Sequence, residues 1–239
     1  MQAVILAGGL GTRLRPYTEH VPKGMVPVLG KPFLQHQIVL LRSQGIKEIL
    51  LLVGHLAEHI CKFFGDGSAY GVNISYSQES LPLGTAGALK LAADKLQKNF
   101  LLLNGDTFLF MNYQNAIDCF LRLQAGGVVV GYKKDLVHTT ANLAVSPNMQ
   151  VVDPKQMQLT HVNAGAMIFS RNILELIPED RAYSIDNEVF PKMIAKKSLW
   201  VYEIQERYFD MGTHNGLKEL ENFLDPTTGR PHAVSRPTQ

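Results

Sequence analysis

The fold is decided by the first stretch of the chain, MQAVILAGGLGTR (residues 1–13). The run from 2 to 7 is apolar almost throughout, which is typical of a strand buried on both faces in a parallel sheet. Three glycines follow, and the stretch closes with Thr12 and Arg13. Glycine lets a backbone approach a ligand closely and point successive N–H groups at an anion. The stretch therefore predicts a strand that ends in a phosphate-binding loop.

Apolar runs and segments of helical periodicity alternate after this loop. Further strands are predicted at 48–54, 72–77 and 100–104, of which the first and the last are apolar and buried. The helical segments between and after them lie at 32–44, 57–64, 85–96 and 113–124. Buried strands separated by helices indicate a parallel sheet covered on both faces. The expected fold class is α/β, with a Rossmann-like, mostly parallel sheet.

The pattern changes beyond a strand predicted at 127–133. Shorter strands are predicted at 142–145, 150–152, 161–169 and 199–204, and helices near 172–176, 186–196 and 216–224. These short pieces indicate a small, partly antiparallel extension of the sheet. We find no linker and expect a single domain over 1–224. The polar, proline-containing tail at 225–239 is expected to be disordered.

The composition argues against several classes of protein. A chain of 239 residues with 46% hydrophobic and 18% charged residues is that of an ordinary globular protein. Its net charge of +2 does not indicate the strongly basic surface that binds nucleic acid or an anionic membrane. Any anion must therefore be bound by a local site. Cys61 and Cys119 have neither zinc-ligand nor disulfide-scaffold spacing. No signal peptide or membrane span is recognised, and we expect a cytoplasmic protein.

The glycine loop differs from two familiar phosphate-binding loops. A P-loop closes with Gly-Lys-Ser/Thr, whereas this one closes with Gly-Thr-Arg. A dinucleotide fingerprint needs a third glycine where this chain has Leu14. What remains is a glycine cradle flanked by two cations, Arg13 and Lys23, which suits a triphosphate. From these residues alone, a tight turn with solvated basic side chains stays open as the alternative.

Two aspartates are candidate metal ligands. Asp106 follows the strand at 100–104, and the carboxyl ends of such strands are where open α/β sheets bind ligands. Asp210 lies far along the chain, in RYFDMGT. Carboxylates of this kind suit Mg²⁺, which takes one or two of them together with substrate phosphates. Taken alone, each aspartate fits a turn or a helix cap better than a metal site, since Asp before Thr or Gly is common in turns.

The run LAGGLGTRLRPYTEHVPKGMVPVLGKP (residues 6–32) closely resembles the signature of the sugar-1-phosphate nucleotidylyltransferases. Enzymes of this family join a nucleoside triphosphate to a sugar 1-phosphate and release pyrophosphate. The similarity continues through PLGTAGAL, LLNGD, VNAG and FDMGT, and so covers nearly all of the first 224 residues. The chain looks most similar to the heptose-1-phosphate and mannose-1-phosphate guanylyltransferase group, which supplies activated sugars for surface polysaccharides.

The resemblance implies a role for each matching residue. Asp106 and Asp210 are expected to share Mg²⁺, and Arg13, Lys23 and Asp106 to form the catalytic set. Residues 1–133 are expected to bind mainly the nucleotide and residues 134–224 mainly the sugar. The expected nucleotide contacts are Leu6, Ala7, Gly8, Gly9, Gly11, Thr12, Arg13, Lys23, Glu79, Gly84 and Thr85.

Glu79 is the residue from which we infer the base. By register with Tyr76, it matches the family position that touches the edge of the base. A carboxylate only accepts hydrogen bonds, and guanine presents adjacent N–H and NH₂ donors, whereas uracil and thymine present one N–H between two carbonyls. Glu79 therefore favours GTP. UTP, CTP or dTTP with a hexose or aminosugar 1-phosphate stays open, because small pocket changes switch such preferences.

The sugar half departs from the family pattern. Asn163 and Gly165 match the strand that contacts the sugar, but the usual Glu-Lys-Pro segment is missing, and Asp153 and Lys155 are expected to replace it. The usual Pro-Lys-Pro also reads Pro-Lys-Gly, with Gly24 as its last residue. These departures motivate an alternative, a catalytically weak regulatory subunit that binds nucleotide sugar. Apolar strands in this half also leave room for a homodimer.

Overall fold

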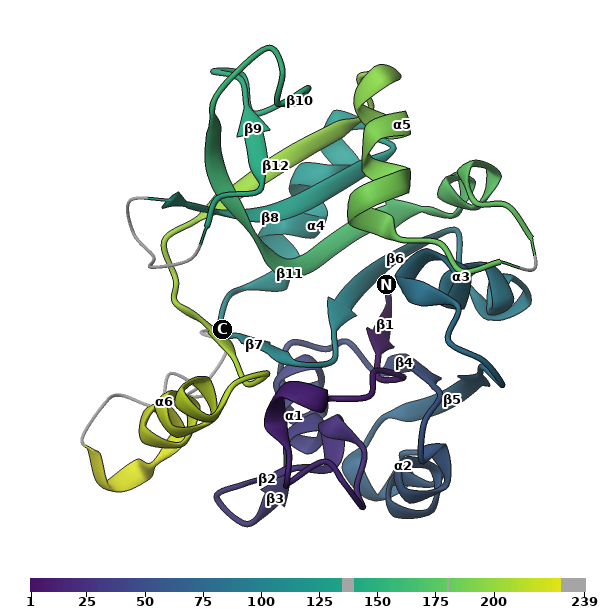
Figure 1. Cartoon of the computed structure of the whole chain (residues 1–239), viewed down its shortest axis with the longest axis vertical. Coiled ribbons are helices and arrows are strands. Elements are labelled where there is room, and N and C mark those ends of the chain that lie inside the picture. The colour runs from purple at the N-terminus through teal and green to yellow at the C-terminus, as the bar shows by residue number, and fades with distance from the viewer. Residues whose placement is uncertain (135–139, 180, 229–239) are drawn as a thin grey trace.

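A computed structural model of the chain describes residues 1–134, 140–179 and 181–228 (Figure 1). A nine-stranded sheet runs through these residues in the order β10-β9-β11-β6-β1-β4-β5, with β8 and β12 joined to it through β11. Its parallel part consists of β1 (Gln2–Leu6), β4 (Glu48–Val53), β5 (Asn73–Gln78) and β6 (Asn99–Asn104). All four strands were predicted from the sequence.

Helices cover both faces of the sheet, because apolar side chains leave both faces of the central strands. One face packs against α1 (Phe33–Ser43), α2 (Ala57–Phe64), α4 (Tyr113–Leu123) and α6 (His214–Leu224). The other face packs against α3 (Gly84–Leu91) and α5 (Phe190–Ala195). The side chain of Ile5 belongs to the first core and that of Val4 to the second, as expected for alternating directions along a strand.

The second half of the chain extends the sheet with mixed pairing. The strands are β8 (Gly127–Lys133), β9 (Leu143–Val145), β10 (Val151–Val152), β11 (Leu159–Ser170) and β12 (Leu199–Ile204). β11 runs antiparallel to β6 and β8, whereas β12 runs parallel to β8. The register of β11 shifts between Asn163 and Met167. The α/β fold class and the partly antiparallel extension are both confirmed.

Two small sheets were not predicted. β7 (Thr107–Leu109) pairs antiparallel with β13 (Tyr208–Asp210), and β2 (Pro27–Val28) pairs with β3 (Lys31–Pro32). Strands of two or three residues are too short to show a period in the sequence. The first pair matters for the site, because it places Asp210 opposite Thr107.

Several predicted helices have different limits. The helix expected near 172–176 is a 3₁₀ helix (Arg171–Leu176), and the one expected at 186–196 is a π turn (Ile185–Val189) that leads into α5. Residues 229–239 of the expected disordered tail lie outside the described residues. Within the described ranges, no helix combines the length and the apolar character needed to cross a membrane.

Candidate active site

A cavity of about 380 Å³ lies where β1 and β6 end, beside the start of α3. This is the edge at which open α/β sheets bind ligands. The structure brings most of the expected nucleotide contacts to its wall. They are Leu6, Ala7, Gly8, Gly9, Gly11, Lys23, Glu79, Gly84, Thr85 and also Asp106.

Two glycines of the loop are required by close contacts. A Cβ on Gly8 would lie 2.8 Å from Glu79 Oε1, so a side chain there would displace the carboxylate. Gly11 has φ +62°, and a Cβ on it would lie 2.9 Å from Thr18 Cγ2. The hydroxyl of Thr18 also donates to the Gly11 carbonyl at 2.8 Å. Gly9 differs, since a Cβ there would meet no described atom within 4 Å. The loop is thus packed on its protein side and open toward the cavity.

Lys23 and Asp106 form an ion pair in the cavity wall. Lys23 Nζ lies 2.6 Å from Asp106 Oδ2, and the two side chains are 13% and 28% exposed. An ion pair of such partial burial is screened less than a surface pair. The lysine expected to bind phosphate therefore neutralises the carboxylate expected to bind metal.

The turn that carries Asp106 is fixed by its neighbours. Gly105 N donates to Leu6 O at 3.0 Å, and a Cβ on Gly105 would lie only 2.2 Å from that oxygen. The amide of Gln37, a buried residue of α1, donates to carbonyls on either side of the turn at 2.9 and 2.8 Å. Because the turn crosses the end of β1, Asp106 is held beside the glycine loop. The sequence analysis did not identify Gln37 as a supporting residue.

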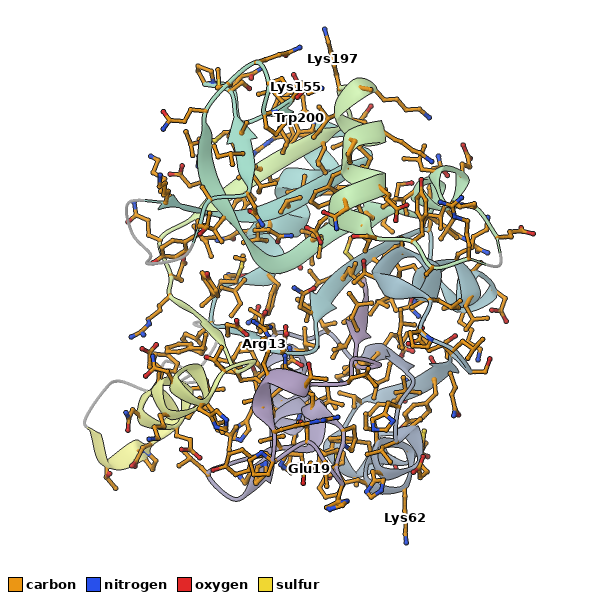
Figure 2. All side chains as sticks on the ribbon, viewed as in Figure 1. Arg13, Glu19, Lys62, Lys155, Lys197 and Trp200 are labelled. Atoms are coloured by element: carbon orange, nitrogen blue, oxygen red, sulfur yellow. The ribbon has the colours of Figure 1, made fainter. Side chains whose placement is uncertain are left out.

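Asp210 and Arg13 reach the same place from the two ends of the chain. A Cβ on Gly212 would lie 2.7 Å from Asp210 Oδ1, 2.8 Å from Lys23 Nζ and 2.9 Å from Arg13 Nη2. Asp210 Oδ1 also accepts from Gly212 N at 2.8 Å. Figure 2 shows Arg13 near the middle of the molecule, where the N-terminal segment meets the segment leading to α6. Two cations and two carboxylates thus converge at one end of the cavity.

The charged cluster fits a magnesium ion by the chemistry of its donors. The described residues contain no group of three or more histidine, cysteine, aspartate or glutamate side chains that could hold a metal alone. The site offers two carboxylates, Asp106 and Asp210, which are hard oxygen ligands. Mg²⁺ commonly takes that number from protein and fills its remaining positions with phosphate oxygens and water.

The other end of the cavity is closed by the segment after β5. Glu79 Oε2 accepts from Leu83 N at 3.0 Å, which bends residues 79–83 into a loop. The second carboxylate oxygen, Oε1, points toward Gly8 and Gly54. Pro82 and Leu52 add apolar surface to the wall here. This end therefore combines an apolar lining with one acceptor group, as a base-binding site requires.

Comparison with known proteins identifies the family. The model of a family described as Nucleotidyl transferase matches residues 2–226. The chain belongs to the nucleotidyl transferase family. Among solved structures, this nucleotidyl transferase is similar to HddC from Yersinia pseudotuberculosis in complex with GMP-PN, with a TM-score of 0.79 and 27% sequence identity. That match covers 94% of this chain and 99% of HddC, and agrees with the Rossmann-like fold.

Two curated relatives are mannose-1-phosphate guanylyltransferases by name. The protein from Saccharomyces cerevisiae is 35% identical over 229 residues, and the one from Mycobacterium tuberculosis is 34% identical over 230 residues. Each match covers 89% of this chain and 61% of the relative. The nucleotidyl transferase chain therefore spans about three fifths of the length of these relatives.

Of the four residues expected to contact the sugar, the structure brings Asn163 and Gly165 near the cavity of this nucleotidyl transferase. Asn163 Nδ2 donates at 3.1 Å to Asp186 Oδ1, and Asp186 lines the cavity. The amide oxygen of Asn163 accepts from Gly165 N at 3.0 Å, which holds the irregular part of β11. Asp186 was missed in the sequence analysis, since no motif marks it. The one indication in the sequence is that Asp186 is the first acidic residue of the helix predicted at 186–196.

The structure does not bring Asp153 and Lys155 to the cavity. Asp153 Oδ1 accepts from Lys155 N at 2.9 Å, which closes a turn after β10. Lys155 is exposed, and Figure 2 shows it near Trp200 and Lys197, at the end of the molecule away from Arg13. Their chemical type and their place in the sequence suggested a sugar site, but the turn is far from the ligand edge of the sheet. Thr12 begins a 3₁₀ turn and also lies outside the cavity wall.

A second charged cluster lies near the start of β11. His161 Nε2 lies 2.9 Å from Glu203 Oε2, and Lys133 Nζ lies 3.3 Å from Glu203 Oε1. Burial raises the pKa of Glu203, but hydrogen bonds from His161 and Lys133 and their charges outweigh it and leave the pKa below its ordinary value. The three residues join β11, β12 and β8, so we interpret this cluster as structural.

Proposed function

We propose that this nucleotidyl transferase moves a nucleoside monophosphate, preferably from GTP, to a heptose-type or mannose-type sugar 1-phosphate. The products are a nucleotide sugar and pyrophosphate. The observation that carries the proposal is the convergence of Arg13, Lys23, Asp106 and Asp210 at one end of the glycine-lined cavity. The names of the curated relatives and the guanine nucleotide bound to HddC support the choice of GTP.

The cavity suits an in-line displacement between two anions. A phosphate oxygen of the sugar 1-phosphate attacks the α-phosphorus, and the bond from that phosphorus to the bridging oxygen of pyrophosphate breaks. The attacking phosphate is already anionic, so the reaction needs no strong general base. The backbone of the glycine loop holds the triphosphate, while Arg13 and Lys23 neutralise the charge that collects on the leaving group. Catalysis then comes from positioning and from placed charge.

Asp106 and Asp210 are the residues that would hold Mg²⁺. When bound, the ion supplies positive charge to the phosphate oxygens. Asp106 is also paired with Lys23 at 2.6 Å, so the ion and the lysine would compete for this carboxylate. The phosphates of the nucleotide would offer Lys23 a second partner.

The choice of nucleotide rests on Glu79. Its side chain lies in the cavity wall beside Pro82 and Gly84 and offers an acceptor to the donor edge of guanine.

On the sugar side, Asp186 and Asn163 are the polar groups next to the cavity. A hydroxyl-bearing ligand of the heptose or mannose type suits such a pair. We also propose a cytoplasmic enzyme, active as a homodimer, whose product feeds polysaccharide synthesis.

Pyrophosphate release tests the proposal. The protein is incubated with Mg²⁺, each of the common nucleoside triphosphates and a panel of sugar 1-phosphates, and we expect the fastest release with GTP. Asp106→Asn should lower kcat by at least ~10²-fold, as the loss of one preorganised electrostatic group does. Asp118→Asn, an exposed change on α4, is the matched control and should leave turnover intact. No release with any pair would favour the alternative of a regulatory subunit that binds nucleotide sugar.

A further inference from the structure

The segment before α5 lies directly against the start of α3. Tyr183 O accepts from Ala86 N at 2.9 Å and from Gly87 N at 3.3 Å, and Tyr183 N donates to Leu83 O at 2.8 Å. The first N–H groups of a helix normally need an outside partner. Here a carbonyl of the second half of the chain supplies it. The loop at the base end of the cavity is thereby joined to the segment that precedes Asp186.

Two glycines allow this close approach. A Cβ on Gly84 would lie 2.7 Å from Tyr183 O, and Gly84 has φ +70°. A Cβ on Gly87 would lie 3.0 Å from Arg181 O. Backbone atoms cannot yield as the end of a flexible side chain can, so any side chain at Gly84 would push the two segments apart. The distance between the two backbone segments is therefore fixed by the lack of a side chain at these glycines.

Thr85 adds a side-chain bond across the same boundary. Its hydroxyl oxygen accepts from Ile185 N at 2.8 Å. The next residue is Asp186, which lines the cavity and whose carboxylate is held by Asn163 at 3.1 Å. Thr85 is thus hydrogen-bonded to the residue that directly precedes Asp186, a polar residue of the proposed sugar side. The family resemblance places Thr85 among the expected nucleotide contacts.

We propose that Thr85 is a positioning residue for the sugar 1-phosphate. Its hydroxyl fixes Ile185 and thereby the place of Asp186 in the cavity, so the base-side loop and the sugar-side segment form one unit. This inference rests on the proposed function. It predicts that a change at Thr85, in the first turn of α3, alters the affinity for the sugar more than the affinity for the nucleotide.

The test compares Thr85→Val with Thr85→Ser. Valine has nearly the same shape but cannot accept a hydrogen bond, whereas serine keeps the acceptor. Thr85→Val should raise KM for mannose 1-phosphate by ~10-fold, the size expected for one lost buried hydrogen bond, and change KM for GTP by less than about two-fold. Thr85→Ser should restore the wild-type KM. A rise in KM for GTP alone would overturn the inference and assign Thr85 to the base.

A double-mutant cycle separates this role from a general loss of structure. If Thr85 acts through Asp186, then Thr85→Val should have no further effect on KM for mannose 1-phosphate once Asp186→Ala is present. Effects that multiply would contradict the inference. Thr85→Ala carries the same expectation if the valine variant does not fold, because it removes the hydroxyl without adding a methyl group. Wild-type protein without turnover would instead refute the proposed function, so the two failures are distinguishable.

Discussion

At the scale of single residues, the ion pair between Lys23 and Asp106 should control how metal ion and nucleotide bind to the site. Lys23 Nζ lies 2.6 Å from the carboxylate of Asp106, which is one of the two groups proposed to hold Mg²⁺. A cation that approaches Asp106 alone has to displace the ammonium group or share the carboxylate with it. Phosphate offers Lys23 another partner, so nucleotide and metal should bind better together than separately.

Replacing Lys23 tests this competition without turnover. Lys23→Met keeps the length of the side chain and removes its charge, so Mn²⁺, used in place of Mg²⁺, should bind more tightly in the absence of nucleotide. We expect a gain on the order of ten-fold, the equivalent of losing one nearby like charge. Electron paramagnetic resonance of free Mn²⁺ measures it. Lys31→Met, at an exposed residue of β3, is the matched control, and unchanged Mn²⁺ affinity in Lys23→Met would contradict the competition.

Glu79 gives the second prediction at this scale. Glutamine at this position can still accept from Leu83 N through its carbonyl oxygen, so the loop should stay closed. Its NH₂ group, however, would replace the oxygen near Gly8, and the proposed function requires an acceptor from this side chain for guanine. Glu79→Gln should therefore lower the ratio of kcat/KM for GTP to that for UTP by ~10-fold. Equal losses with both nucleotides would remove the argument for guanine, and Glu48→Gln at an exposed site is the control.

The residues of the site could be predicted where the sequence imposes a local requirement. Gly8 and Gly11 follow a buried strand, and the contacts that exclude a side chain there are the reason why glycine is needed. Gln37 and Asp186 could not be found in this way. Their roles depend on segments that only the folded chain brings together, and each residue type is ordinary in its local sequence.

At the scale of elements, long periodic segments were predictable and short ones were not. The strands β1, β4 and β6 are apolar over most of their five or six residues, so their buried character is visible in the sequence, whereas β5 carries only Ile74 and Tyr76 among polar residues. β7 and β13 have three residues each and pair only because the chain returns to this place. Phe209 of β13 is buried against Phe223 of α6, with ring centroids 4.7 Å apart. This tertiary contact, rather than local propensity, brings Asp210 to the site.

The start of α4 offers a prediction about stability that is independent of the site. Asn112 is the N-cap of this helix, and its side-chain oxygen accepts from Gln114 N at 2.9 Å. Asn112→Ala should lower the free energy of unfolding by ~1 kcal/mol, as measured by urea denaturation, with turnover unchanged. Asn115→Ala, an exposed change within the same helix, is the control and should be nearly neutral. An equal loss in both variants would show that the cap contributes nothing specific.

At the scale of the whole molecule, the cavity belongs to both parts of the chain. Its walls come from the glycine loop, from the start of α3 and from Asp186. The charged cluster adds Asp210, so residues from the first and the last strands meet in one place. β11 pairs with β6 and with β8, which makes the two parts one continuous sheet. A ligand bound there contacts segments that are distant in the sequence and should stabilise the entire fold.

Thermal unfolding measures that stabilisation. A ligand at about 100 times its Kd adds ~2.7 kcal/mol to the stability of a folded protein, which corresponds to a rise in Tm of roughly 5–10 °C for a chain of this size. We expect that rise with GTP and Mg²⁺ and a smaller one with UTP and Mg²⁺ at the same concentration. Removal of Mg²⁺ with EDTA should reduce the GTP effect, because it takes away the cation that would bind the phosphates, and Asp210→Asn should do the same, because it removes a carboxylate that would hold this cation. A shift that is the same for both nucleotides and is insensitive to EDTA would mean that neither Glu79 nor the two aspartates contribute to nucleotide binding.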